Sequence, residues 1–361
     1  MYNNNNNNIN NNINNNIKGI KKILTGIKPT GTPHLGNYLG AIAPALQYIH
    51  DHDGHDNQNQ EVESYYFIAD YHALTTIHDP KILHNYILEV AATWVAFGLD
   101  VNKTVFFRQS DIPQVMELSW ILGCFSSKGL MNRAHAYKAL LDQNTCNEDD
   151  PDAGINMGVY TYPVLMAADI LLFDSDLVPV GQDQIQHIEI ARDIAKAFNS
   201  RYGKDGVDIL KMPNGIVRKE VAVLPGLDGR KMSKSYNNTI PLFLPSDKLR
   251  KLIMKIKTDS SGPTEPKNPD DSLIFTIYSE FASEEQKNQM KQRFLNGIAW
   301  GQAKQELFEL MDNFLKNPRE KFNYLMSNPD EIEKLLKRGK ELALISAQKT
   351  LNRVRKTIGI N

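Results

Sequence analysis

The sequence predicts an α/β fold in which short strands alternate with amphipathic helices, followed by a helical region. Runs rich in β-branched and aromatic residues occur at 21–27, 64–70 and 103–111. Between them, 35–50 and 81–99 carry apolar residues at helical spacing. Strands and helices that alternate at this pace form a Rossmann-like, doubly wound parallel sheet.

The same reasoning divides the chain into two folded parts. Residues 112–150 are expected to be a helical insertion that ends in a polar, acidic loop, and 158–198 then read as helix, strand, turn and helix. We therefore expect a first domain over 21–244. After residue 245 helix signals dominate, which predicts a helical C-terminal domain over 245–361.

Capping signals mark helix starts in this second domain. Ser283 and Gln286 have the spacing of a capping box. Asparagine followed by proline at Asn317 and again at Asn328 predicts two further starts, because proline is favoured in the first turn of a helix.

Composition restricts the function classes. The net charge of −1, from 41 basic and 42 acidic residues, gives no overall attraction for nucleic acid, and the basic cluster at 353–356 is expected on a solvated helix face. Two cysteines and no CxxC pair indicate no metal site. No apolar run reaches the ~20 residues of a membrane span, so we expect a soluble protein with neither membrane nor DNA as a partner.

Residues 1–20 form an asparagine-rich leader without a core-forming pattern, which is expected to be disordered. The first acidic residue is Asp51, and Lys18, Lys21 and Lys22 are basic. An acid-poor, basic leader is compatible with organellar import, although enrichment in Arg and Ser is missing. A low-complexity extension is the alternative.

The stretch "GIKPTGTPHLGNYLG" at 26–40 indicates a nucleotide site. Its glycines allow the backbone to come close to a phosphate. Gly31 and Gly36 match the first half of a P-loop, but Asn37 and Tyr38 stand where Lys and Ser or Thr are required. The nucleotide must therefore be bound in another way.

A second motif, "GLDGRKMSKSYNN" at 226–238, places Arg230, Lys231 and Lys234 around two serines. Two mobile ammonium groups can follow negative charge as a phosphate is transferred. An ordinary surface loop is the alternative interpretation, because Lys and Ser are common in such loops.

Together the two motifs resemble those of class I aminoacyl-tRNA synthetases. Residues 33–37 resemble the HIGH motif, and 231–235 read KMSKS letter for letter. The strings "TYPVLMAADILL" (161–172) and "VPVGQDQIQHIEIARDIA" (178–195) are similar to bacterial-type tryptophanyl-tRNA synthetases. The resemblance extends from about residue 22 to the end of the chain.

The resemblance implies a two-step acyl transfer. The carboxylate of tryptophan attacks the α-phosphorus of ATP, which enters with Mg²⁺ as substrate, and tryptophanyl-adenylate and diphosphate form. The terminal ribose of tRNA(Trp) then takes the acyl group and AMP leaves. No nucleophile from the protein is needed, so positioning and electrostatics determine the rate. The helical C-terminal domain would contact the tRNA and its anticodon.

The resemblance also assigns residues around ATP. His34, Lys231 and Lys234 would be catalytic, with His34 donating to a phosphate oxygen. Two positions depart from the family: Asn37 replaces the second histidine of HIGH, and Lys28 stands where many relatives carry glutamine. The expected ATP contacts are Lys28, Pro29, Thr30, Gly36, Asn37, Gly181, Gln182, Asp183, Val223, Lys231, Met232, Ser233, Lys234 and Ser235.

For tryptophan the resemblance implies a pocket with apolar walls and one acceptor. Asp169 would accept the indole N–H, while Tyr162 and Gln184 would hold the α-amino group. A carboxylate accepts a phenol O–H equally well, so a tyrosyl enzyme stays open as an alternative, as does a catalytically silent RNA-binding paralogue. The expected pocket residues are Leu24, His72, Tyr162, Met166, Asp169, Val178, Val180 and Gln184.

The family resemblance further implies a homodimer, and apolar faces within 112–141 could supply the interface. A bacterial-type enzyme behind an asparagine tract suggests the mitochondrial matrix, with the cytoplasm as the alternative.

Overall fold

The computed structural model describes residues 21–52, 61–147, 150–181, 184–204, 206–217 and 224–360. The asparagine-rich leader lies outside this range. So do Gln182, Asp183 and Val223, three of the residues expected to bind ATP.

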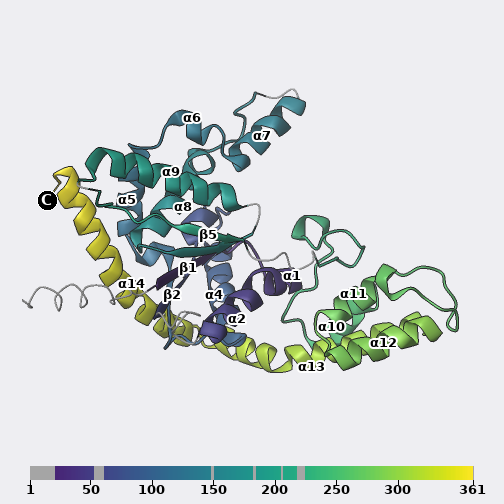
Figure 1. The fold of residues 1–361 in the computed structure, drawn as a ribbon. Coiled ribbons are helices and arrows are strands. Elements are labelled where there is room, and N and C mark those ends of the chain that lie inside the picture. Colours follow the sequence, from purple (N-terminus) through teal and green to yellow (C-terminus); the bar gives the residue numbers. More distant parts are fainter. Residues whose placement is uncertain are drawn as a thin grey trace, which may run out of the picture.

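Within these described ranges, five parallel strands form one sheet in the order β3-β2-β1-β4-β5 (Figure 1). The order runs outward from β1 in both directions, which opens a crevice between the carboxyl ends of β1 and β4. The expected α/β class with a Rossmann-like, doubly wound sheet is confirmed. The strands are β1 Lys21–Ile27, β2 Val62–Ile68, β3 Thr104–Arg108, β4 Leu177–Val180 and β5 Asn214–Val217.

Helices and short helical turns connect the strands. In the first connection the helix is interrupted by a π-helix, a form that is often found at functional sites. The elements are α1 Leu35–Asn37, the π-helix η1 Tyr38–Ile42, α2 Ala43–His52, α3 Asp70–Ala73, α4 Pro80–Ala96, the 3₁₀ turn η2 Gln109–Asp111, α5 Gln114–Gly123, α6 Lys128–Met131, α7 His135–Cys146, α8 Met157–Leu172 and α9 Ile185–Tyr202.

Side chains of the strands alternate between two cores, as the period of two in a strand requires. Leu24, Phe67 and Phe107 face the core covered by α5, α8 and α9. Tyr66 and Phe106 face the opposite core, under α2 and α4. Both faces of the sheet are thus covered, which is usual for a parallel sheet.

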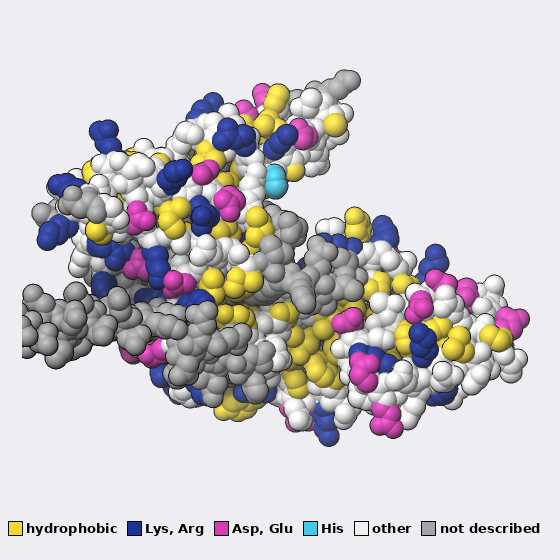
Figure 2. Space-filling view, in the orientation of Figure 1, with side chains coloured by type: hydrophobic (Ala, Val, Ile, Leu, Met, Phe, Trp, Pro, Cys, Tyr) yellow, Lys and Arg dark blue, Asp and Glu magenta, His cyan; other side chains and the backbone are white. Residues whose placement is uncertain are grey.

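The described chain after β5 first forms the helical region at the right of Figure 1 and Figure 2, before its last helix returns to the sheet. The capping box at Ser283 and the helix start at Asn328 are confirmed. The helix start at Asn317 is wrong, because Pro318 lies inside one continuous helix whose buried Leu315 and Phe322 continue the apolar face past it. The elements are the 3₁₀ turn η4 Lys234–Tyr236, α10 Ser246–Ile253, the 3₁₀ turn η5 Pro269–Asp271, α11 Leu273–Ser279, α12 Glu284–Asn296, α13 Trp300–Ser327 and α14 Pro329–Ile358.

The last helix, α14, leaves the helical region and crosses back along the sheet, as Figure 1 shows in yellow. Its Ala347 and Leu351 are buried in the same core as Leu24 and Phe107. Two of the basic residues expected to be solvated are ion-paired to the sheet domain, as Arg353 contacts Asp174 and Arg355 contacts Glu117. The cluster therefore fastens α14 in place. The domain boundary after residue 244 stays a prediction.

None of the helices in the described ranges has the length and apolar character needed to cross a bilayer.

Replacing Gly339 by alanine is expected to destabilise the fold. Gly339 lies where α14 meets β3, and a Cβ there would stand 1.8 Å from the backbone oxygen of Phe106. Because backbone cannot rotate away, α14 must shift, at a cost of about 1–3 kcal/mol in the free energy of unfolding. Gly301→Ala in α13 is the matched control, since nothing lies within 4 Å of its Cβ. Denaturant unfolding of both variants should show a loss for Gly339→Ala alone; equal midpoints would contradict the close approach of α14.

Candidate functional site

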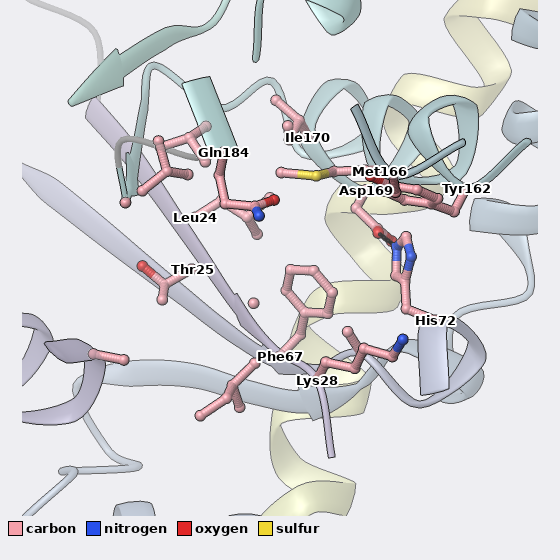
Figure 3. A pocket seen from close by; sticks show the side chains of 18 of the residues that line it. Leu24, Thr25, Lys28, Phe67, His72, Tyr162, Met166, Asp169, Ile170 and Gln184 are labelled. Carbon is pink, nitrogen blue, oxygen red and sulfur yellow. Dashed lines mark hydrogen bonds and ion pairs between the residues drawn. The ribbon is translucent and has the colours of Figure 1, made fainter. Parts of the chain in front are cut away.

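A cavity of about 760 Å³ lies at the carboxyl edge of the sheet, at the crevice between β1 and β4 (Figure 3). It lies where ligands of doubly wound sheets bind. Helix α7, which projects from the body in Figure 1, contributes Ala136, Ala139 and Leu140 to one wall. The residues expected from the sequence that line this cavity are Leu24, Lys28, His72, Tyr162, Met166, Asp169, Val178, Val180, Gly181 and Gln184.

Helix α8 supplies three of these side chains. Asn156 caps its start by accepting a hydrogen bond from the N–H of Val159 at 3.0 Å. From this start, Tyr162, Met166 and Asp169 follow at i, i+4 and i+7, a spacing that places them on one face of a helix. Figure 3 shows all three next to one another along one wall of the cavity.

The strands supply the apolar floor. Leu24 of β1 lies beside Val178 and Val180 of β4. Phe67 of β2 also lines the cavity and was not expected from the sequence. Its ring occupies the space beside Gly26, where a Cβ would come within 2.5 Å of the ring. The absence of a side chain at Gly26 thus makes room for the Phe67 ring in the cavity wall. The two residues are paired in the register of β1 against β2, which the sequence alone does not give.

Asp169 is a buried carboxylate of the cavity that accepts several hydrogen bonds. It is 2% exposed and accepts from the amide nitrogen of Gln109 at 2.8 and 2.9 Å. His72 Nε2 lies 3.0 Å from the second carboxylate oxygen, as the dashed line in Figure 3 marks. Burial raises the pKa of Asp169, and the hydrogen bonds from His72 and Gln109 oppose that shift.

Gln109 was missed by the sequence reasoning, although it stands at the carboxyl end of a strand. Two other polar residues also follow strands of the sheet. Asp70, after β2, accepts the N–H of Ser110 at 3.0 Å and so supports the turn. Asp111 pairs with Arg108 at 3.0 Å and does not line the cavity. A polar residue directly after a strand is a candidate for the site, but this position in the sequence does not distinguish Gln109 from Asp111.

The KMSKS loop contacts the glycine-rich turn through Lys234. Its Nζ donates to the carbonyl of Thr30 at 3.0 Å and lies beside Gly31. Backbone hydrogen bonds from Leu35 to Ile240, and from Leu242 to Pro33, attach the segment after the loop to the same turn.

The other expected ATP contacts lie beside this junction or on the loop. Gly36 lies against the ring of His34, with Met232 close by, and the Oδ1 of Asn37 accepts the N–H of His34 at 3.0 Å. Lys231 and Lys234 are both exposed, and the Nζ of Lys234 donates to the turn at Thr30. The expected contacts that lie on the turn or the loop rather than in the cavity lining are Pro29, Thr30, Gly36, Asn37, Lys231, Met232, Ser233, Lys234 and Ser235.

Burial changes the proton affinity of the basic groups at this junction. It lowers the pKa of Lys234 and of Lys28, whose Nζ donates to Thr75 Oγ1 at 2.9 Å. His34 is 8% exposed, and burial together with the nearby charge of Lys234 lowers its pKa to about 4. His34 is therefore neutral at physiological pH and can donate one N–H to an anion. Among the described residues, no group of His, Cys, Asp or Glu is arranged to hold a metal ion.

The lowered pKa of His34 predicts a pH dependence of stability. Between about pH 6.5 and 4 the unfolded chain binds a proton at His34 that the folded protein rejects, so stability falls as the pH falls through this window and levels off below it. The loss at pH 5 is on the order of 1–2 kcal/mol. Unfolding of wild type and His34→Asn at pH 7 and 5 checks this. The variant should lose less than wild type; equal losses would place the histidine in solvent.

Comparison with known proteins agrees with this geometry. The family model described as tRNA synthetases class I (W and Y) matches residues 18–316. A tryptophan–tRNA ligase from Pseudomonas aeruginosa is 52% identical over 339 residues, covering 94% of this chain and 74% of that protein. One from Neisseria meningitidis is 48% identical over 341 residues, covering 94% and 98%.

Solved structures show the same likeness. A crystal structure of tryptophanyl-tRNA synthetase from Campylobacter jejuni, complexed with ADP and tryptophan, superposes with a TM-score of 0.83. It is 40% identical and covers 94% of this chain and 99% of that one. With a family match over most of the chain and relatives near half identity, the protein belongs to the class I tRNA synthetases for tryptophan and tyrosine.

Proposed function

We propose that this protein attaches L-tryptophan to tRNA(Trp) in two ATP-dependent steps. The observation that carries the proposal is the continuity of one site: an apolar pocket, in which Asp169 is the one buried carboxylate among the described lining residues, opens toward a turn against which the KMSKS lysine Lys234 lies. The names of the most similar relatives support tryptophan as the amino acid.

In the first step the amino acid is held by its two ends. The indole would lie between Leu24, Phe67 and Met166, with its N–H toward Asp169. The α-amino group would lie near Tyr162 and Gln184. This placement leaves the tryptophan carboxylate facing Lys28 at the mouth of the pocket, where ATP must approach.

ATP, with Mg²⁺ as part of the substrate, would lie over the turn at 28–37. A carboxylate oxygen of tryptophan bonds to the α-phosphorus, and the bond from that phosphorus to the bridging oxygen of diphosphate breaks. Lys234 and neutral His34 would stabilise the negative charge that grows on the phosphate oxygens. Lys231, which is exposed on the same loop, would add a second positive charge once the triphosphate is present. The ribose hydroxyl of tRNA then displaces AMP from the carbonyl carbon.

The tyrosyl alternative is not favoured, since the similar curated relatives are tryptophan–tRNA ligases. Isotope exchange between diphosphate and ATP separates the remaining possibilities, with tryptophan and tyrosine assayed side by side. Exchange with tryptophan alone is the expected result. Exchange with tyrosine would reverse the assignment, and no exchange with either would indicate a silent paralogue.

We also propose that the protein acts as a homodimer. Helix α5 exposes large apolar side chains, with Trp120 78% and Met116 47% exposed in the single chain. A second copy is the occupant that the family implies. Sedimentation of wild type and Trp120→Glu tests this proposal: wild type should sediment as a dimer and the variant should dissociate more readily.

For the compartment we propose the mitochondrial matrix, because the sequence before Asp51 is basic and lacks acidic residues. A fusion of residues 1–22 to a fluorescent protein should enter mitochondria; a cytoplasmic signal would favour the alternative.

A further inference from the structure

We infer that Gln109 is a positioning residue that presents Asp169 to the indole N–H and thereby contributes to amino-acid specificity. The inference rests on the proposed function and extends it to a residue outside the cavity lining. Gln109 is completely buried directly after β3, and its amide nitrogen donates to the carboxylate of Asp169, which lines the cavity.

The orientation of the Gln109 amide follows from its neighbours. The N–H of Tyr71 donates to Gln109 Oε1 at 3.1 Å and, in a shared bond, to Asp70 at 3.0 Å. A reversed amide would direct its NH₂ group at that N–H and its oxygen at the carboxylate of Asp169. Both contacts would be repulsive, so the NH₂ group must face Asp169.

The donors around Asp169 leave a defined acceptor site. Oδ2 receives Gln109 Nε2 at 2.9 Å and lies 3.0 Å from His72 Nε2, whereas among the described residues Oδ1 receives only Gln109 Nε2, at 2.8 Å. A carboxylate oxygen accepts about two hydrogen bonds, so one position is left on Oδ1. The carboxylate is held by two elements, η2 and α3, that do not belong to its own helix.

This remaining position suits an indole better than a phenol. An indole N–H donates and accepts nothing, so a single acceptor satisfies it. A phenol O–H could donate to Oδ1, but its oxygen would also need a donor, and the donors of Gln109 and His72 are already directed at Asp169. A buried oxygen without a donor costs roughly 1–3 kcal/mol. Gln109 therefore favours tryptophan in two ways. It orients the carboxylate of Asp169, and its amide hydrogens, which are bonded to that carboxylate, cannot donate to a phenol oxygen.

The test replaces Gln109 by methionine, which has a similar length and no donor. We expect the KM for tryptophan in diphosphate exchange to rise about 10-fold, with kcat and the KM for ATP nearly unchanged. The preference for tryptophan over its benzothiophene analogue, which lacks the N–H, should fall by a similar factor. Gln114→Met is the matched control, because the amide of Gln114 pairs with Gln348 of α14 at 2.8 Å, away from the cavity.

A second variant guards against a general packing defect. In Gln109→Glu the new carboxyl meets Asp169, and two adjacent carboxylates share a proton more readily as the pH falls. A protonated Glu side chain can again donate to Asp169, so the tryptophan preference of this variant should recover between pH 8 and 6, while wild type changes little. A purely structural role for Gln109 predicts no such recovery.

The outcomes are distinguishable. If a folded Gln109→Met protein keeps the wild-type preference while Asp169→Ala loses it, the role of Gln109 is overturned and the proposed function stands. If wild type shows no tryptophan-dependent exchange at all, the proposed function fails and the inference fails with it.

Discussion

Replacing Lys234 by alanine is expected to lower the rate of tryptophan-dependent adenylation about 10²-fold or more, the scale of losing one preorganised partner of transition-state charge. The affinity for tryptophan should barely change, because Lys234 contacts the turn at Thr30 and does not line the apolar pocket. Single-turnover adenylate formation measures the first quantity and equilibrium binding of tryptophan the second.

The structure distinguishes Lys234 from other lysines of the chain by its contact with the turn. Lys231 and Lys234 are both exposed on the loop, and the Nζ of Lys234 already contacts the turn at Thr30. Lys248→Ala, on the exposed side of α10, is the control for loss of one positive charge. Lys234→Arg should restore only part of the rate, because a planar guanidinium cannot follow a moving charge as an ammonium does. Near-normal rates in Lys234→Ala would reduce the loop to a structural element.

The fold was predictable where it depends on interactions between residues close together in the sequence. Strand 21–27 matches β1 residue for residue, and the capping box at Ser283 starts α12 as expected. The error at Asn317 shows the limit of local signals. Proline following asparagine is compatible with a helix start, but burial of Leu315 and Phe322 against distant residues keeps the helix continuous. The return of α14 to the sheet depends on contacts such as Gly339 with Phe106, which no window of sequence contains.

The candidate site divides in the same way. Tyr162, Met166 and Asp169 could be grouped because their spacing places them on one helical face. Phe67 and Gln109 could not, since Phe67 requires the register of β1 against β2, and Gln109 requires the side-chain orientation after β3. The resemblance supplied the pocket residues, but it did not reveal what holds Asp169 in place.

Replacing Asp169 by alanine is expected to weaken the use of tryptophan about 10- to 150-fold and to leave ATP binding largely intact. A buried carboxylate that accepts an indole N–H makes a charge-assisted hydrogen bond worth roughly 1.5–3 kcal/mol. The loss should appear in kcat/KM for tryptophan, because the bond holds the side chain in both the ground state and the transition state.

A purely structural role for Asp169 is the competing explanation, and the hydrogen bonds that Asp169 makes to buried neighbours support it. Alanine would leave the buried amide of Gln109 and the ring nitrogen of His72 without their acceptor, at a cost of about 1–3 kcal/mol each in stability. Helix capping is not the reason for Asp169, since α8 is capped at Asn156. Unfolding must therefore be measured beside the kinetics, with Asp193→Ala on the exposed face of α9 as the control.

The benzothiophene analogue of tryptophan separates the two accounts, because it has the shape of the substrate and no N–H. Wild type should prefer tryptophan strongly in adenylation. Asp169→Ala should lose most of that preference, because the variant has no carboxylate to accept the indole N–H. This expectation holds whatever stability the variant has lost. If wild type and the variant discriminate between the two substrates by the same ratio, Asp169 does not bind the indole N–H, and the tryptophan must lie in the cavity in another orientation.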